Sequence, residues 1–112
     1  MQDDVVGIAP EKVISPKSRW KLISILHKAK WWSMAFGTWT KDGKTGYVLA
    51  QRWNGFPGKK GQPCSRGQAI WFVLPEDTYP LYIDSKFIPE EMREEIRGKL
   101  GLKQQEKSST EV

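Results

Sequence analysis

The first half of the chain alternates apolar and polar residues in a way that favours β-strands. From Arg19 to Lys28 the sequence R-W-K-L-I-S-I-L-H-K is rich in residues of high β-propensity and is bounded by charges. A strand here would carry Trp20, Leu22, Ser24 and Leu26 on one face and Lys21, Ile23, Ile25 and His27 on the other. A helix is the alternative, because Leu22, Ile25 and Leu26 also fit helical spacing. We predict the strand.

The next segment has the sequence of a β-hairpin. Two β-prone runs, Trp32–Lys41 and Lys44–Trp53, are separated by Asp42-Gly43. Asp-Gly is typical of a two-residue type I′ turn, because both central residues of that turn need a positive φ. Counting outward from the turn predicts four cross-strand pairs: Lys41 with Lys44, Thr40 with Thr45, Trp39 with Gly46, and Thr38 with Tyr47.

The second half of the chain begins with a predicted long loop. Residues 55–67 hold four glycines and two prolines, a composition that disfavours regular structure. The near-continuous apolar run from Gln68 to Leu74 then predicts a central strand that is covered on both faces. Residues 81–83 predict a short edge strand, because Pro80 beside them cannot donate to a sheet.

A helix is predicted near the C-terminus. Pro89 suits the first helical position, where the missing N–H is not needed, and acidic residues follow it in the first turn. Three apolar residues recur every four positions and would form a stripe that packs on the sheet: Met92, Ile96 and Leu100. Gly101 suits the C-cap.

These elements predict one α+β domain. Its core would be a twisted antiparallel sheet of about five strands, either open or curled into a partial barrel, with a single C-terminal helix packed on it. We assign residues 1–18 to an irregular N-terminal arm, residues 19–102 to the domain, and residues 103–112 to a frayed polar tail. A chain of 112 residues is the usual size for one domain.

Charge is distributed unevenly along the chain. The net charge of +5 divides into −2 for residues 1–16, +10 for residues 17–66 and −3 for residues 67–112. The central segment holds eleven lysines and arginines against Asp42 alone, which is typical of a surface that meets an anionic partner. The alternative is a solvated cationic face that the acidic helix balances in space.

Residue content argues against catalysis and metal binding. The single Cys64 allows no intramolecular disulfide, so we expect a reducing, cytoplasmic setting, and we expect neither a secretion signal nor a membrane helix. One histidine, His27, and one cysteine do not make a zinc site. Cys64 with His27 as its base is the one nucleophile pair to consider, and two single occurrences are weak evidence for it. We predict no enzyme activity, no cofactor and no metal.

The basic glycine-rich loop is the candidate binding site. Its glycines match neither a Walker nor a dinucleotide-binding pattern. Cations interleaved with aromatic residues are instead typical of proteins that bind single-stranded nucleic acid or structured RNA. The predicted nucleic-acid-binding residues are Arg52, Phe56, Lys59, Lys60 and Arg66, with Trp31 and Trp39 as exposed aromatics. We expect the other central tryptophans, Trp32, Trp53 and Trp71, in the core. The alternative function is a protein-interaction or small-ligand module, including a homodimer, and the alternative for the loop is a charged surface without a ligand.

Three strings of the chain carry a resemblance. Arg52-Trp53-Asn54-Gly55, Gly61-Gln62-Pro63-Cys64-Ser65-Arg66-Gly67 and Trp71-Phe72-Val73-Leu74-Pro75 resemble strings in small uncharacterised bacterial accessory proteins carried by phages and integron gene cassettes. The resemblance covers roughly residues 36–75. It implies an origin on a mobile element and implies no activity.

Overall fold

The computed structural model describes residues 5–102, and within them the fold is α+β. Its main sheet has the strand order β1-β2-β3-β6, and every neighbouring pair is antiparallel. The strands of this sheet are β1 (Trp20–Lys28), β2 (Trp32–Lys41), β3 (Lys44–Trp53) and β6 (Phe72–Val73). A separate two-stranded sheet joins β4 (Cys64–Ser65) to β5 (Gln68–Ala69). The predicted five-stranded sheet is therefore replaced by a four-stranded sheet and a small second one.

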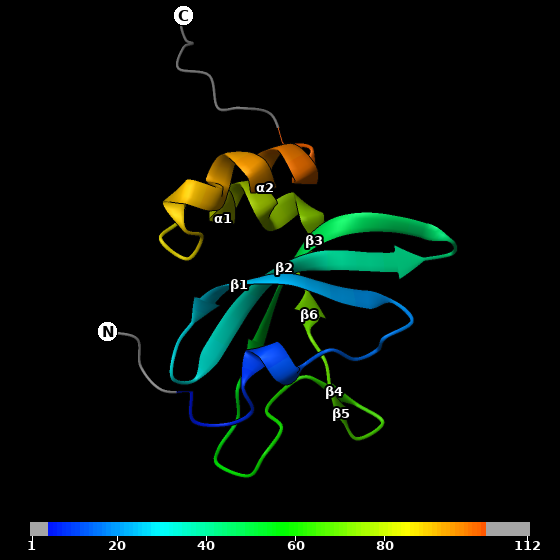
Figure 1. The fold of residues 1–112 in the computed structure, drawn as a ribbon, viewed down its shortest axis with the longest axis vertical. Coiled ribbons are helices and arrows are strands. Elements are labelled where there is room, and N and C mark those ends of the chain that lie inside the picture. The colour runs from blue at the N-terminus through cyan, green and yellow to red at the C-terminus, as the bar shows by residue number, and fades with distance from the viewer. Residues whose placement is uncertain (1–4, 103–112) are drawn as a thin grey trace, which may run out of the picture.

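Helical segments cover one side of the main sheet. They are the 3₁₀ turn η2 (Glu76–Thr78), the helix α1 (Tyr79–Ile83), the 3₁₀ turn η3 (Glu90–Met92) and the helix α2 (Arg93–Leu100). The glycine-rich loop and the β4–β5 sheet lie at the end of the molecule opposite α1 and α2 (Figure 1). Among the residues described, no helix is long and apolar enough to cross a membrane.

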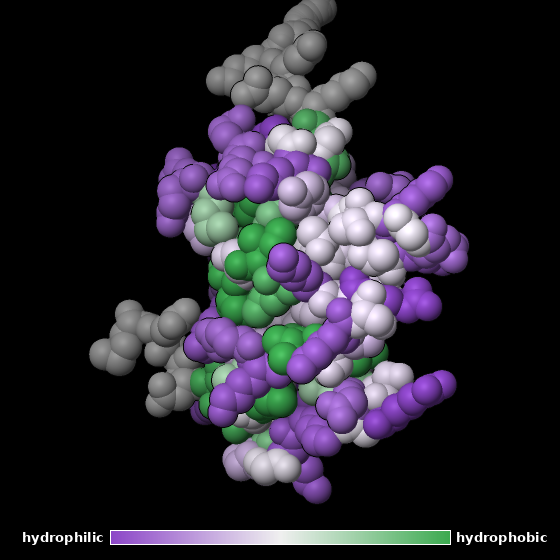
Figure 2. Space-filling view, turned by 45° about the vertical axis from the view of Figure 1, so that its right-hand side comes forward, coloured by the Kyte–Doolittle hydropathy of each residue, from purple (hydrophilic) through white to green (hydrophobic). Residues whose placement is uncertain are grey.

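The sheet separates two clusters of buried side chains. Alternate residues of β2 face opposite ways, so Met34 and Phe36 pack toward the helices while Ala35 packs on the other side. The second side is covered by the segment before β1, which includes the 3₁₀ turn η1 (Pro10–Lys12). The indole Nε1 of Trp71 donates to the carbonyl of Val13 at 2.8 Å and ties this segment to the chain after β5. On the face shown in Figure 2, hydrophobic residues gather in the middle and hydrophilic residues surround them.

The hairpin prediction is confirmed. All four predicted cross-strand pairs occur, and the pairing continues to Trp32 opposite Trp53. Asp42 has φ 53° and Gly43 has φ 77°, so both turn residues are left-handed, as a type I′ turn requires.

The strand at residues 20–28 is also confirmed, but its two predicted faces are wrong. The pairing of β1 with β2 shifts register between Leu22 and Ser24 and again between Ile25 and His27. Each such bulge interrupts the alternation of side chains across the sheet. Trp20 and Leu22 therefore pack in the second cluster, whereas Leu26 packs under the helices. Sequence alternation alone does not reveal these bulges.

Two predicted strands are corrected by the structure. Residues 68–74 are two short strands and not one central strand, because Ile70 bridges to Ser15 between them and β6 lies at the edge of the main sheet. Residues 81–83 belong to the helix α1 and not to an edge strand, so two helices take the place of the single predicted one. Tyr79 and Ile83, four residues apart, are both buried, which is a helical spacing.

The C-terminal helix packs as predicted, with a later start. Pro89 precedes the 3₁₀ turn η3, and the α-helix begins at Arg93. The predicted stripe holds, since Ile96 is buried in the cluster under the helices and Met92 and Leu100 pack against it. Gly101 has φ 75° and caps the helix. The predicted tail, residues 103–112, lies outside the described residues, as do residues 1–4 of the predicted arm.

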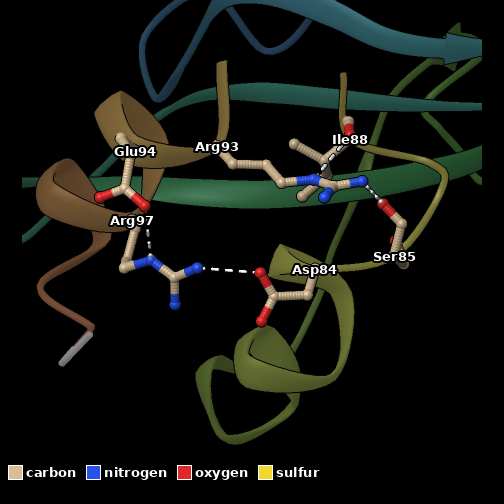
Figure 3. Close-up of polar contacts among 6 residues, drawn as sticks. All are labelled: Asp84, Ser85, Ile88, Arg93, Glu94 and Arg97. Carbon is tan, nitrogen blue, oxygen red and sulfur yellow. Dashed lines mark hydrogen bonds and ion pairs between the residues drawn. The ribbon is translucent and has the colours of Figure 1, made fainter. Parts of the chain in front are cut away.

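Arginines of α2 hold the segment between the two helices. Arg93 donates to the carbonyls of Ser85 and Ile88 at 3.1 and 3.3 Å (Figure 3). Arg97 donates to the carboxylate of Asp84 at 2.8 Å. These contacts fix residues 84–88 against α2 and so set the position of this segment beside the sheet.

Candidate functional site

The loop between β3 and β4 folds over the end of the sheet and forms an open groove of ≈ 970 Å³. Its side-chain walls come from the β1–β2 turn, the end of β3, the loop itself and the start of β4, and three glycines of the loop also line it. The side chains that matter here are Trp31, Trp53, Phe56, Lys59, Lys60 and Cys64. We call this feature the loop groove.

Three aromatic rings of the loop groove are exposed. Trp53 is 63% exposed, Phe56 66% and Trp31 45%. The rings of Trp31 and Phe56 meet edge to face with centroids 5.8 Å apart, and Lys30 Nζ lies 5.4 Å from the Trp31 ring. Exposed aromatic clusters of this kind mark surfaces that bind a partner. Here they stand beside lysine side chains.

Arg52 lies beneath the loop groove and not in it. Its side chain is buried, with the residue only 3% exposed. The guanidinium donates to the carbonyls of Trp53 at 3.2 Å and Ile70 at 2.6 Å, and also to the carbonyl of Lys60. Burial lowers the pKa of Arg52. Its role in this structure is to tie the loop to the chain after β5, so the predicted phosphate contact is unavailable to it.

Asn54 fixes the other side of the loop. It is fully buried, and its amide accepts a hydrogen bond from Ser33 Oγ at 2.8 Å and donates to the carbonyl of Ala29 at 2.9 Å. Its backbone N–H donates to the carbonyl of Trp31 at 2.7 Å. Asn54 thus joins the β1–β2 turn to the loop and brings Trp31 beside Phe56. Sequence reasoning missed this residue, and a polar amide between a strand end and Gly55 was the available signal.

Two glycines are required by close backbone approach. Gly61 has φ +70°, and a Cβ there would overlap the carbonyl oxygen of Trp53 and lie 2.8 Å from Arg52 Nη2. Gly55 has φ +89°, and its Cβ would lie 2.7 Å from the Cα of Gly61. Glycine at these positions lets the loop lie directly on the end of β3.

The structure brings together only part of the predicted site. Phe56, Lys59, Lys60 and Trp31 line the loop groove, and the Lys60 ammonium also donates to the carbonyl of Gly67. Arg66 is exposed in the β4–β5 turn and is not among the lining residues.

Trp39 is also apart from the loop groove. It lies toward the far end of β2, eight residues from Trp31, which is roughly 26 Å along an extended chain. Its ring is half-buried and packs against the second core cluster, next to the hairpin turn. The loop groove therefore lacks Trp39 as well as Arg52 and Arg66.

Trp53, like Trp39, is an aromatic residue that sequence reasoning misplaced. It was predicted in the core, yet it is exposed at the end of β3. Trp71 is buried as predicted, and Trp32 is partly buried against the helical cluster. The position of Trp53 directly before the glycine-rich loop was the signal that could have indicated exposure.

The single cysteine and histidine are in different surroundings. Cys64 is exposed in the loop groove, and its thiol donates to the carbonyl of Gly61 at 3.2 Å. The His27 ring packs between Trp32 and Phe87, with ring centroids 4.8 and 5.0 Å away. In the described part of the chain, no group of three His, Cys, Asp or Glu side chains is placed to hold a metal ion.

No protein family, curated protein or solved structure matches this chain. The resemblance to accessory proteins of mobile elements therefore stays a prediction.

Proposed function

We propose that this protein binds single-stranded nucleic acid, or an unpaired segment of structured RNA, in the loop groove and carries out no catalysis there. The observation that carries the proposal is the convergence of three exposed rings and two lysines on one groove. Trp31, Trp53 and Phe56 supply stacking surfaces, and Lys59 and Lys60 supply positive charge. This is the combination by which sequence-tolerant single-strand binders hold bases and phosphates.

Charge favours a polyanion over other ligands for this groove. The lining residues that the structure describes include two lysines and no carboxylate. The part of the chain that contains the loop, residues 17–66, has a net charge of +10. A phosphate backbone would release its counterions on binding there, which makes the affinity depend on salt.

The aromatic contribution can be tested with one matched pair of variants. Phe56→Ala removes a ring that is 66% exposed, and Leu81→Ala removes an apolar side chain that is 76% exposed on α1, outside the loop groove. Loss of one stacked base weakens binding by about 1–3 kcal/mol. We expect Phe56→Ala to weaken binding of a labelled single strand by about that amount and Leu81→Ala to leave it unchanged. Equal affinities for the two variants would contradict a stacking role.

A module for an apolar peptide or small ligand is the second candidate. The observation in its favour is that the groove walls are largely aromatic, as in many ligand pockets. Binding by such a module would respond little to salt. Little binding to single strands even at low salt would favour it.

A further inference from the structure

A second groove lies on the other side of Trp53. It has a volume of ≈ 560 Å³ and runs along the sheet between the loop and the helical layer. Arg52 and Pro63 line it together with five aromatic side chains and two glutamine amides: Trp32, Trp53, Phe72, Tyr82, Phe87, Gln51 and Gln62. We call it the sheet groove. Trp53 and Gln62 line both grooves, so the two form one continuous surface.

Strand pairing explains why these side chains share one side of the sheet. Trp32 is opposite Trp53, and Trp53 is opposite Gln62 in an antiparallel bridge. Directly opposed residues of antiparallel strands point to the same side. In the next row, Phe72 is opposite Gln51. The pairing register of the strands, and not the conformation of a loop, therefore places these side chains on the floor of the sheet groove.

The far wall of the sheet groove is held by the helices. Tyr82 comes from α1, and Phe87 comes from the segment that Arg93 fixes through the carbonyls of Ser85 and Ile88 (Figure 3). The Phe87 ring also packs edge to face on Trp32, with centroids 4.9 Å apart. An aromatic wall fixed in this way can receive a flat ring without rearrangement.

The polar groups of the sheet groove suit a neutral heterocycle. Gln51 Nε2 lies 4.0 Å from the sulfur of Met34, a weak acceptor, and the described contacts give Gln51 Oε1 and the Gln62 amide no hydrogen-bond partner. A glutamine amide offers both donors and an acceptor, as does the edge of a nucleobase. No carboxylate is among the described lining residues, so a cationic ligand would find no opposite charge there. The charged lining residue, Arg52, already donates to three backbone carbonyls.

We infer that the sheet groove binds a nucleobase of the strand whose backbone lies in the loop groove, and that Gln51 and Gln62 recognise its hydrogen-bonding edge. This inference rests on the proposed function and adds base preference to it. The exposed Trp53 ring separates the two sites, and a single strand crosses it to place one base beyond the lysines. Phosphate contacts carry no base information, so any preference must come from contacts such as these.

The test measures affinity for three labelled DNA homopolymers, of adenine, cytosine and thymine. Each is about twelve nucleotides long, which lies within the roughly 4–16 nucleotides that a single OB fold covers on a single strand. We expect a spread of roughly tenfold between the best and the worst homopolymer, the size that one hydrogen-bonded base contact provides. Gln62→Leu and Gln51→Leu keep the side-chain volume and remove the amide. Each should compress that spread to about twofold or less, while the slope of affinity against salt persists.

Gln68→Leu is the control, because Gln68 is an exposed glutamine of β5 that lines neither groove. It should keep the full spread. Gln62 is exposed, so we expect Gln62→Leu to fold, and its binding can be measured even if Gln51→Leu does not fold. Equal affinities of the wild-type protein for all three homopolymers would overturn the inference and leave the proposed function standing. An unchanged spread in Gln62→Leu would overturn it too. Absence of binding to every homopolymer at low salt would instead remove the proposed function, and the inference with it.

Discussion

Trp53 and Gln62 exchange two backbone hydrogen bonds, with N–O distances of 2.8 and 3.1 Å. This bridge joins the return of the glycine-rich loop to the end of β3. It also places both side chains on one side of the sheet, where the Trp53 ring becomes the wall between two grooves. The binding surface that we propose is thus set by a backbone contact between two strand-like segments.

Gly61→Ala tests whether this backbone contact is required. A Cβ at Gly61 would overlap the Trp53 carbonyl, whereas a Cβ at Gly58 meets nothing within 4 Å, although both glycines have positive φ. We expect Gly58→Ala to lower the free energy of unfolding by about 1 kcal/mol, which is the cost of holding an alanine backbone in the left-handed region. Gly61→Ala should cost roughly 1–3 kcal/mol more, because backbone must move. Urea denaturation measures both, and equal losses would contradict the close approach.

Arg52→Met separates a structural role from a phosphate contact. The variant leaves the carbonyls of Ile70, Lys60 and Trp53 without their donor, so we expect stability to fall by roughly 2–4 kcal/mol. Lys59→Met, at an exposed site, should change stability by less than about 0.5 kcal/mol. Full stability of Arg52→Met, together with a shallower salt dependence of oligonucleotide binding, would show that Arg52 contacts phosphate after all.

Two double variants separate the effect of lysines in the loop groove from the effect of the total charge of the protein. Lys59 and Lys60 line the loop groove, whereas Lys41 and Lys44 flank the hairpin turn. Replacing the first pair by alanine should flatten the log–log slope of affinity against salt by roughly one to two units, since each lost phosphate contact removes about 0.7. The second pair removes the same net charge and should leave the slope almost unchanged. Equal effects would mean that binding follows net charge and no particular groove.

His27 should make stability depend on pH. Burial lowers the pKa of His27 below its ordinary value of 6.5, and the positive charge of Lys86 lowers it further. The unfolded chain therefore binds this proton more readily, so the contribution of His27 to stability is fully present above the unfolded pKa and is lost as pH falls from that value toward the lower folded pKa. We expect the urea midpoint to decrease as pH falls below about 6.5, and the decrease to be smaller in His27→Phe. The same decrease in both proteins would assign the effect to other groups.

Local signals in the sequence were sufficient for part of this structure. The hairpin followed from Asp42-Gly43, because that dipeptide fixes the turn and the turn fixes the register. The C-terminal stripe around Ile96 followed from helical spacing. Both depend on residues close in the chain.

Positions that depend on distant partners were not predictable from the sequence. Arg52 is buried because carbonyls eight and eighteen residues away accept its hydrogen bonds. Trp53 is exposed because its ring stands between two open grooves, although its backbone pairs with Trp32 and Gln62. The faces of β1 were wrong because two bulges shift its register. In the candidate site, local composition identified the loop, whereas tertiary contacts determine which of its side chains are exposed.

The central claim, that the loop groove binds single-stranded nucleic acid, is tested most directly by titrating a labelled oligonucleotide with the wild-type protein at two salt concentrations. The account predicts binding at low salt with micromolar protein. It also predicts affinity that falls with salt, with a log–log slope of roughly −0.7 for each phosphate neutralised on a single strand. No binding at low salt and micromolar protein would contradict it, because even non-specific electrostatic binding is visible under those conditions.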